Sequence, residues 1–252
     1  MMNTTTSPDS GISRYYEAIR QLQQQVINEQ VDLLQQVAAA MTQTIVDDGR
    51  IFLFGTGHSH LLAEEGHYRA GGLAPVVPIL ASNLMLHDNA LLSGVLERTP
   101  GLAESILARY RPRPGEMLFV FSNSGVNQLP VEMALLARNR KLVTVSVSSF
   151  SYAQVATLSV AQQRLDQIVD YALDNGGQPG DSLLPVPGSA WSTGPSSTLI
   201  GTLIWHCLVS EVAQQLAQQQ IDPPIFASAN LPGAAEHNQA LLDRWRPRNP
   251  HL

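Results

Sequence analysis

The sequence is short of cysteine, of basic runs and of long apolar stretches, and each shortage excludes a class of protein. The single cysteine, Cys207, cannot form a disulfide within the chain. The net charge is −6 at pH 7 and no run of Lys and Arg occurs. Phosphate backbones require clustered basic side chains, so we expect no nucleic-acid partner. The longest apolar stretches, such as residues 74–81, are too short to cross a bilayer, so no membrane partner is expected.

The beginning of the sequence also lacks a feature, namely the charged and apolar regions of a signal peptide. Together with the single cysteine, this predicts a cytoplasmic protein.

A long helix is predicted first. Between Ile12 and Asp48 there is neither glycine nor proline, and apolar residues recur mostly three, four or seven positions apart, as in an amphipathic helix. It should end at Asp48 and Gly49, where glycine can adopt the left-handed conformation. Roughly 35 helical residues measure about 50 Å, which is longer than a small domain is wide. We therefore expect residues 11–48 to contact another subunit in a homodimer or homotetramer.

Beyond Gly49 the pattern changes to short apolar runs that alternate with helical stretches. The runs typical of strands are residues 50–54, 74–80, 116–122, 141–147 and 166–173. The stretches typical of helices are residues 60–70, 99–110, 127–139, 195–220 and 234–245. Near-continuous apolar strands separated by helices indicate a parallel sheet covered on both faces. The predicted fold class is α/β: a three-layer αβα sandwich around a mostly parallel five-stranded sheet, preceded by the long helix.

Two loops after predicted strands are suited to an anion. In open parallel sheets, ligands bind beyond the carboxyl ends of the strands, where backbone N–H groups favour negative charge. The loop "GTGHS" at residues 55–59 has glycines that allow close approach, and Ser59 begins the next helix. The loop "FSNSGVNQLP" at residues 121–130 places hydroxyls and amides around Gly125. Hydroxyls and amides without a lysine favour a phosphate monoester, although the same residues also form ordinary turns.

A third polar cluster lies at the start of the last long helix. Ser196, Ser197 and Thr198 fall in its first turn, with Pro195 expected at the first helical position. Ligand contact and helix capping explain this cluster equally well.

The sequence does not match the common motifs for nucleotide binding or for a hydrolase nucleophile. The first loop does not match G-x-x-x-x-G-K-[ST], and the dinucleotide pattern G-x-G-x-x-G would need glycine at His60. The G-x-S-x-G nucleophile motif fails because its last position is Leu61.

The order of these motifs resembles a known family. A strand, G-x-G-x-Ser, a helix, a strand, and then an apolar strand ending in Ser-x-Ser-Gly is similar to the sugar isomerase (SIS) domain of phosphosugar isomerases and phosphosugar-binding regulators. The segments "FGTGHSH", "YRAGGLAPV", "VFSNSG", "DNGGQPGD" and "EHN" resemble stand-alone bacterial SIS proteins that are phosphoheptose isomerase-like. The resemblance implies a flavodoxin-like sheet and one SIS domain over residues 1–252, with a dimerisation helix at 11–48, a core at 50–220 and a C-terminal extension at 221–252.

The loops and the resemblance together give the expected contacts to a small phosphorylated sugar. They are Gly57, His58, Ser59, Ser122, Asn123, Ser124, Gly125, Asn127, Ser148, Ser196, Ser197 and Thr198. In many SIS domains a threonine stands where this sequence has Asn127. No organic cofactor is implied.

Catalytic residues are implied by the resemblance to phosphoheptose isomerases, which use a glutamate after the first loop and a histidine in the last long helix. Here these are Glu65 as the base and His206 as the acid, groups suited to moving a carbonyl between C1 and C2. Glu64 and Glu65 lie only five and six residues beyond Ser59, closer than in that family. Glu64 and Glu211 stay alternative bases. A solvated Glu65 and a hydrogen-bonded core His206 are the structural alternatives.

A metal site is a further alternative. His60, Glu64 and His67 have the i, i+4, i+7 spacing of one helical face, with His58 just before them, and zinc accepts such ligands. The same groups could instead form a polar pocket wall.

The expected function is an aldose–ketose isomerase acting on a sugar phosphate. The alternatives are a non-catalytic phosphosugar sensor and a lyase that removes a lactyl ether or ammonia on the same scaffold. The absence of a basic helix before the core argues against a free-standing repressor.

Overall fold

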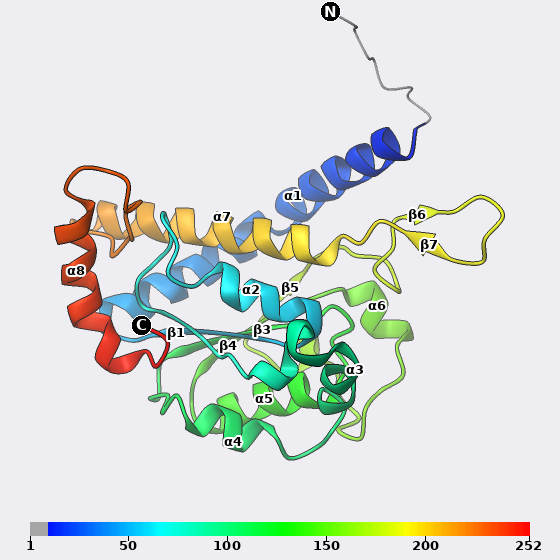
Figure 1. The fold of residues 1–252 in the computed structure, drawn as a ribbon, viewed down its shortest axis with the longest axis horizontal. Coiled ribbons are helices and arrows are strands. Elements are labelled where there is room, and N and C mark those ends of the chain that lie inside the picture. The colour runs from blue at the N-terminus through cyan, green and yellow to red at the C-terminus, as the bar shows by residue number, and fades with distance from the viewer. Residues whose placement is uncertain (1–9) are drawn as a thin grey trace, which may run out of the picture.

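The computed structural model describes residues 10–252 and contains a five-stranded parallel sheet (Figure 1). The strands are β1 (Ile51–Gly55), β2 (Val76–Pro78), β3 (Met117–Phe121), β4 (Val143–Ser148) and β5 (Tyr171–Asp174). Their order in the sheet is β2-β1-β3-β4-β5. This is the doubly wound order of flavodoxin-like folds, and it confirms the predicted fold class. The direction of winding reverses between β1 and β3.

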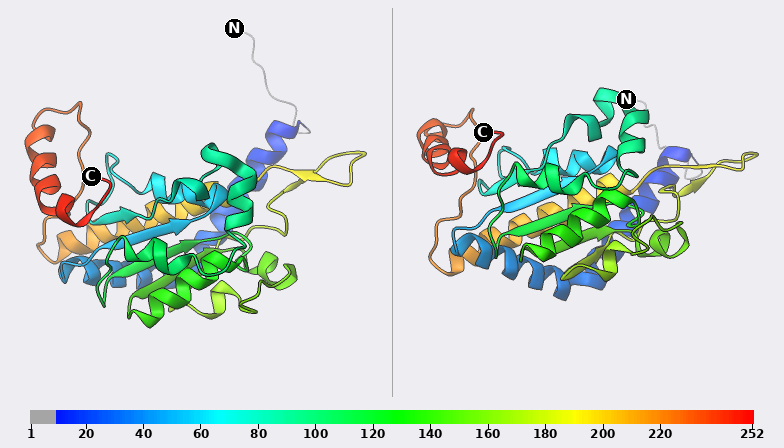
Figure 2. Two further views of the ribbon diagram at one scale, coloured as in Figure 1. Left: turned by 60° about the horizontal axis from the view of Figure 1, so that its bottom comes forward. Right: turned by 90° about the horizontal axis from the view of Figure 1, so that it is seen from below.

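Helices cover both faces of the sheet. They are α1 (Gly11–Val46), α2 (His60–Glu65), α3 (Leu86–Leu96), α4 (Ala103–Ala108), α5 (Gln128–Asn139), α6 (Phe150–Val155), α7 (Ser197–Gln218) and α8 (Ala234–Trp245). The long helices α1 and α7 lie together across one face, while α4 and α5 cover the other (Figure 2). Alternate strand residues point to opposite faces, so β1 sends Ile51 and Leu53 to the first core and Phe52 and Phe54 to the second.

The end of α1 differs from the prediction in one detail. The helix ends at Val46, and it is Asp48, with φ 55°, that adopts the left-handed conformation. A Cβ added to Gly49 would lie 2.7 Å from the backbone oxygen of Thr44. Glycine is therefore required at position 49 because the backbone passes so close to the helix. The expected contact of residues 11–48 with another subunit stays a prediction.

Other element boundaries also differ. The helix expected at residues 60–70 ends at Glu65, with Gly66 as its C-cap. Glycine, a poor helix former, stands there because a Cβ would lie 2.3 Å from Leu53 Cδ1 of β1. The helix expected at 99–110 is only α4, and α3 was not predicted at all. The strand expected at 166–173 begins as a 3-10 turn, Leu165–Gln167, before β5.

Two segments extend beyond the sandwich. At one end α8 packs through Trp245 on Phe226 and Ala74, which attaches the C-terminal extension to the segment before β2. At the other end a ribbon of β6 (Leu184–Pro185) and β7 (Ser192–Thr193) projects from the body (Figure 1).

None of the helices within residues 10–252 combines the length and the apolar character that a membrane span requires.

Candidate functional site

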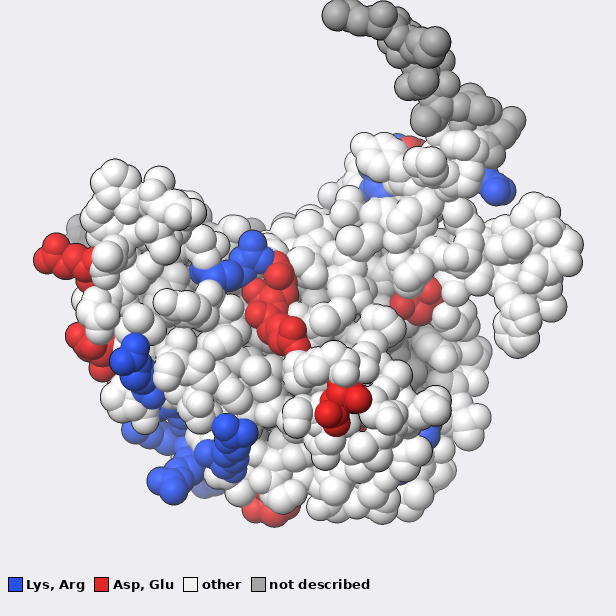
Figure 3. Space-filling view, in the orientation of Figure 1, with Lys and Arg blue, Asp and Glu red and all other residues white. Residues whose placement is uncertain are grey.

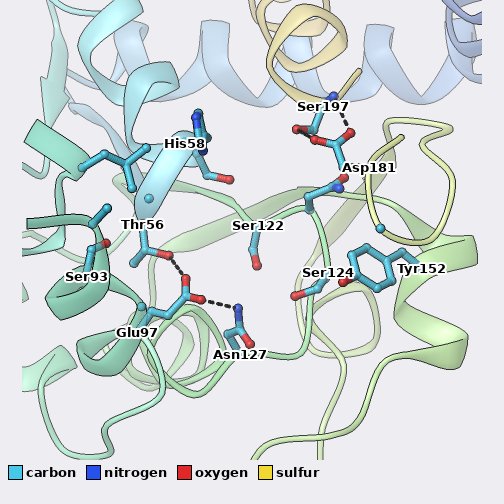
Figure 4. A pocket seen from close by; sticks show the side chains of 17 residues that line it. Thr56, His58, Ser93, Glu97, Ser122, Ser124, Asn127, Tyr152, Asp181 and Ser197 are labelled. Carbon is cyan, nitrogen blue, oxygen red and sulfur yellow. Dashed lines mark hydrogen bonds between the residues drawn. The ribbon is translucent and has the colours of Figure 1, made fainter. Parts of the chain in front are cut away.

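A cavity of about 320 Å³ opens at the carboxyl ends of β1 and β3, where the strand order reverses (Figure 4). Open parallel sheets bind ligands at this position. We call it the serine-loop cavity. Of the predicted substrate-binding residues, those that line it are Gly57, His58, Ser59, Ser122, Asn123, Ser124, Asn127 and Ser197. Gly125, Ser148, Ser196 and Thr198 do not line it. The structure thus brings together most, but not all, of the predicted binding residues.

The loop after β1 forms one wall. A Cβ added to Gly55 would lie 2.3 Å from the backbone oxygen of Ser59, so the loop can fold back on itself only with glycine there. Gly57 follows with φ 55°, a left-handed conformation that glycine adopts without strain. This tight turn brings residues 56–59 to the cavity wall at the beginning of α2.

The loop after β3 lies in the middle of the cavity. Figure 4 shows its Ser122 and Ser124 between Thr56 and Glu97 on one side and Asp181 and Ser197 on the other. Backbone hydrogen bonds hold it: Gly125 N donates to Ser122 O at 3.1 Å, and Ser149 N donates to Asn123 O at 2.9 Å. Within residues 10–252 the hydroxyl of Ser124 is shielded from solvent and has no hydrogen-bond partner. A buried polar group without a partner is costly, so this hydroxyl is available to a ligand.

Three of the predicted residues that do not line the cavity lie close to it. Gly125 and Ser148 pack behind the loop after β3, and Thr198 lines an adjoining cavity. Gly125 makes the turn with φ 63°, and a Cβ there would be 3.4 Å from the Cβ of Ser148, which is fully buried. Ser148 thus packs behind the loop. Thr198 lies beside an adjoining cavity that includes Gly194 and Pro195.

The first turn of α7 already holds a carboxylate. Asp181 accepts hydrogen bonds from the backbone N–H groups of Ser196 and Ser197 at 3.0 and 2.9 Å, and from the Ser197 hydroxyl at 2.6 Å. A negative charge at a helix N-terminus is stabilising because of the free N–H groups and the helix dipole. Ser196 is the N-cap residue, so Pro195 precedes the cap and the prediction that it occupies the first helical position was wrong.

Glu97, directly after α3, was missed by the sequence analysis and lines the cavity. Its carboxylate accepts hydrogen bonds from the Thr56 hydroxyl at 2.7 Å and from Asn127 Nδ2 at 3.0 Å (Figure 4). Arg98 lies 2.9 Å from the same group, whose side chain is 16% exposed. Glu97 therefore joins the two loops at the cavity floor.

The predicted catalytic pair is brought together, but outside this cavity. His206 Nε2 lies 2.9 Å from Glu65 Oε1, and Arg69 contacts the same carboxylate. Burial, and secondarily the charge of Arg69, lowers the pKa of His206. Both side chains are about one-third exposed, and neither lines the serine-loop cavity. The alternative base Glu211 accepts a hydrogen bond from Gln215 farther along α7.

The possible metal ligands do not gather. Because α2 ends at Glu65, His67 falls outside the helix and its Nε2 contacts the backbone oxygen of His251 at 3.3 Å. His60 is buried, 3.2 Å from Glu64, and burial lowers its pKa. Among residues 10–252 no three His, Cys, Asp or Glu side chains form a group that could hold a metal ion.

The cavity therefore combines the serines and glycine of two loops with the carboxylates Glu97 and Asp181. In the described part of the chain, no lysine or arginine lines it. Such a wall can bind an anion through neutral donors while the carboxylates accept hydrogen bonds from sugar hydroxyls. Asp181 lies in the segment "DNGGQPGD", so the sequence contained a signal for it; Glu97 had none because α3 was not predicted.

Known proteins resemble this chain in sequence and in fold. UPF0309 proteins of Brucella canis and of Brucella melitensis biotype 2 are each 44% identical over 205 residues, covering 81% of this chain and 84% of theirs. The solved phosphoheptose isomerase of Francisella tularensis has a similar fold, with a TM-score of 0.56 and 16% identity over 81% of this chain and 96% of that one. The isomerase of Neisseria gonorrhoeae gives a TM-score of 0.51 and 21% identity over the same shares.

A sequence profile of the SIS domain matches residues 14–149, which begins within α1 and ends after β4. The matched region is more than half of the 252 residues. The resemblance found in the sequence is confirmed: this chain belongs to the SIS domain family.

Proposed function

We propose that the serine-loop cavity binds a phosphorylated sugar through its phosphate. The observation that carries the proposal is the buried, unpartnered hydroxyl of Ser124 between two glycine-containing turns. Ser59, Ser122 and the backbone of the first loop face the same space. A phosphate oxygen would supply the hydrogen bond that Ser124 lacks, and its charge would be stabilised by the N–H groups at the strand ends.

The reaction we propose is an aldose–ketose isomerisation of that sugar. It needs a base for the C2 proton and an acid at the carbonyl oxygen. Of the carboxylates Glu97 and Asp181, which line the cavity, Asp181 is bound to the first turn of α7, so we assign the base to Glu97. Glu65 and His206, hydrogen-bonded to each other outside the cavity, are the alternative pair. The two assignments differ in which carboxylate is required for turnover.

A non-catalytic phosphosugar sensor is a second candidate, favoured by the contacts of Glu97. Both of its oxygens already accept hydrogen bonds, from Thr56 and Asn127, and Arg98 pairs with it. A carboxylate fixed in this way is suited to recognising a sugar hydroxyl as well as to accepting a proton.

Phosphate recognition is tested by Ser124→Ala. Losing a hydrogen bond to a charged group should weaken binding of sugar phosphates at least about tenfold while leaving the weak binding of the free sugars unchanged. Isothermal titration with a panel of hexose, heptose and amino-sugar phosphates measures both. Ser105→Ala, on the exposed side of α4, is the matched control and should bind as the wild type does. Equal losses for phosphorylated and free sugars would contradict the assignment.

Catalysis is tested by proton NMR in D₂O with the same panel. Disappearance of the C2 proton signal shows proton abstraction, with or without formation of the partner sugar. Glu97→Gln should abolish this exchange and Glu65→Gln should leave it, and the reverse result would move the base to Glu65. Ligand binding without exchange in the wild type would support the sensor.

A further inference from the structure

Two arginine-containing segments far apart in the sequence border one cavity at the opposite end of the sheet. Residues 111–113 and 246–248 both read Arg-Pro-Arg. They line a cavity of about 400 Å³ together with Arg50 and Arg109. Figure 3 shows basic side chains gathered on this side of the molecule, at the lower left. We call it the arginine cavity.

Two of its arginines have structural roles. Arg50 is buried and bonds Glu116 through Nε at 2.7 Å and through Nη2 at 2.9 Å. Its remaining N–H groups donate to the backbone oxygens of Tyr110, Arg111 and Arg248. Arg248 pairs with Glu116 at 3.1 Å and with Asp48 at 2.8 Å. These guanidinium groups are neutralised within the fold.

The other four arginines have no such compensation. Arg109, Arg111, Arg113 and Arg246 are exposed. Within residues 10–252 none of their side chains forms an ion pair, and no Asp or Glu lines the cavity. In a chain of net charge −6, this local excess of positive charge is the opposite of the overall balance.

The backbone at Arg111 is a second unusual feature. Its φ of 45° is left-handed, at a helix end where glycine or asparagine is favoured. Its own backbone oxygen accepts from Arg50, so this conformation is held by the buried arginine. Six other non-glycine residues in the described part of the chain share a positive φ, and of the seven Arg111 alone lines this cavity.

The positive charge of the cavity also affects His251. The pKa of His251 is lowered to about 4, first by burial and then by the charge of Arg109, with smaller effects of His67 and His60.

We propose that the arginine cavity is a second ligand site, which binds a small anion carrying two phosphate groups. Four uncompensated guanidinium groups balance two phosphates of about −1.5 to −2 each. One guanidinium group can donate two parallel hydrogen bonds to a phosphate group, which makes arginine more suitable than lysine for such a ligand. The volume lies within the range of about 300–1,000 Å³ that is usual for small-molecule sites. The acidic remainder of the chain disfavours nucleic acid, which needs an extended basic surface.

This inference does not rest on the proposed function. Arg50 and Glu116 directly precede β1 and β3, whereas Gly55 and Ser122 lie at the other ends of the same strands. The two cavities lie at opposite ends of the same strands and have no lining residue in common.

The test uses inorganic pyrophosphate as the probe, in isothermal titrations of the full chain at about 0.15 M salt, where weak surface electrostatics are screened. The wild type and Ser124→Ala should both bind about one pyrophosphate per chain in the arginine cavity. The double variant Arg111→Asn/Arg246→Gln should bind at least tenfold more weakly. Its melting temperature should be unchanged or higher, because asparagine tolerates the left-handed conformation at position 111. Arg14→Gln, which removes an exposed charge on α1, should bind as the wild type does.

Two results would overturn the proposal: pyrophosphate binding that is absent in the wild type, or equally strong in the double variant. Tighter binding of a short single-stranded oligonucleotide at the same arginines would also reject it and assign the surface to nucleic acid. Failure of sugar phosphates to bind the serine-loop cavity would leave this result unaffected, so the two proposals fail separately.

Discussion

At the carboxyl ends of β1 and β3, serines, glycines and two carboxylates line a cavity, whereas at the amino ends of the same strands six arginines line another. The first would bind negative charge with backbone and hydroxyl donors, which act at short range and require a close geometrical fit. The second would bind it with full charges on long side chains. The difference shows that net charge and composition say little about where a chain can hold an anion, because the fold decides which donors meet.

Of the substitutions that test this comparison, the one at Glu116 should lower stability most, because Glu116 pairs with the buried Arg50 and with Arg248. Glu116→Gln would leave Arg50 without its charge partner. Both side chains are buried, since Glu116 is 2% and Arg50 is 5% exposed. Breaking a buried pair in this way should lower the free energy of unfolding by about 3 kcal/mol. Urea denaturation measures it.

The matched control is Glu104→Gln, which removes an exposed partner of Arg140 and should cost less than about 1 kcal/mol. Similar losses for the two variants would mean that the Arg50 pair is no more important than a surface pair.

A smaller effect is expected at the other end, where Asp181 caps α7. Asp181→Ala removes the acceptor for the N–H groups of Ser196 and Ser197 and should lower the free energy of unfolding by about 1–2 kcal/mol. Asp181→Asn keeps one acceptor oxygen and should lose less. Asp243→Ala, an exposed carboxylate on α8, is the control. An unchanged urea midpoint for Asp181→Ala would show that the cap is dispensable.

The smallest effect concerns the pH response of His251. Its folded pKa of about 4 lies below the ordinary value of 6.5, so between these values the unfolded chain binds more protons than the folded one. Its contribution to stability is therefore complete above pH 6.5 and is lost as the pH falls towards about 4. The ring is only half-buried, so screening should limit the loss to about 1 kcal/mol at about pH 5.

Melting temperatures of the wild type and His251→Asn at neutral and acid pH measure this contribution. The wild type should lose more on acidification than the variant does. Parallel losses would mean that His251 titrates as it does in an unfolded chain.

The sheet and the two loops that line the serine-loop cavity could be predicted because they depend on local pattern. The apolar run of β3 followed by Ser122 and Ser124 identifies both a buried strand and a polar strand end. Helix α3 was missed for the opposite reason. It is kinked at Asn89, and Leu91 and Val95 are exposed, so its apolar residues show no regular buried face. Glu97 was lost with it.

The arginine cavity could not be predicted, because no basic run exists in the sequence. Arg111 and Arg246 line one cavity only because the C-terminal extension packs on the rest of the protein through Trp245. Likewise, the spacing of His60, Glu64 and His67 predicted one helical face, but the helix ends before the third ligand, where Gly66 packs closely on Leu53. Tertiary contacts, not local pattern, decide both outcomes.

The exposed ribbon between β6 and β7 gives the protein a useful optical property. Of its three tryptophans, Trp205 and Trp245 are 2% and 1% exposed, whereas Trp191 in the ribbon is 81% exposed. The guanidinium groups of Arg244 and Arg248 lie 5.0 and 5.2 Å from the centre of the Trp245 ring, beside the arginine cavity. Single-tryptophan variants would thus report separately on the ribbon, the α7 core and the arginine cavity by their fluorescence, without an attached dye.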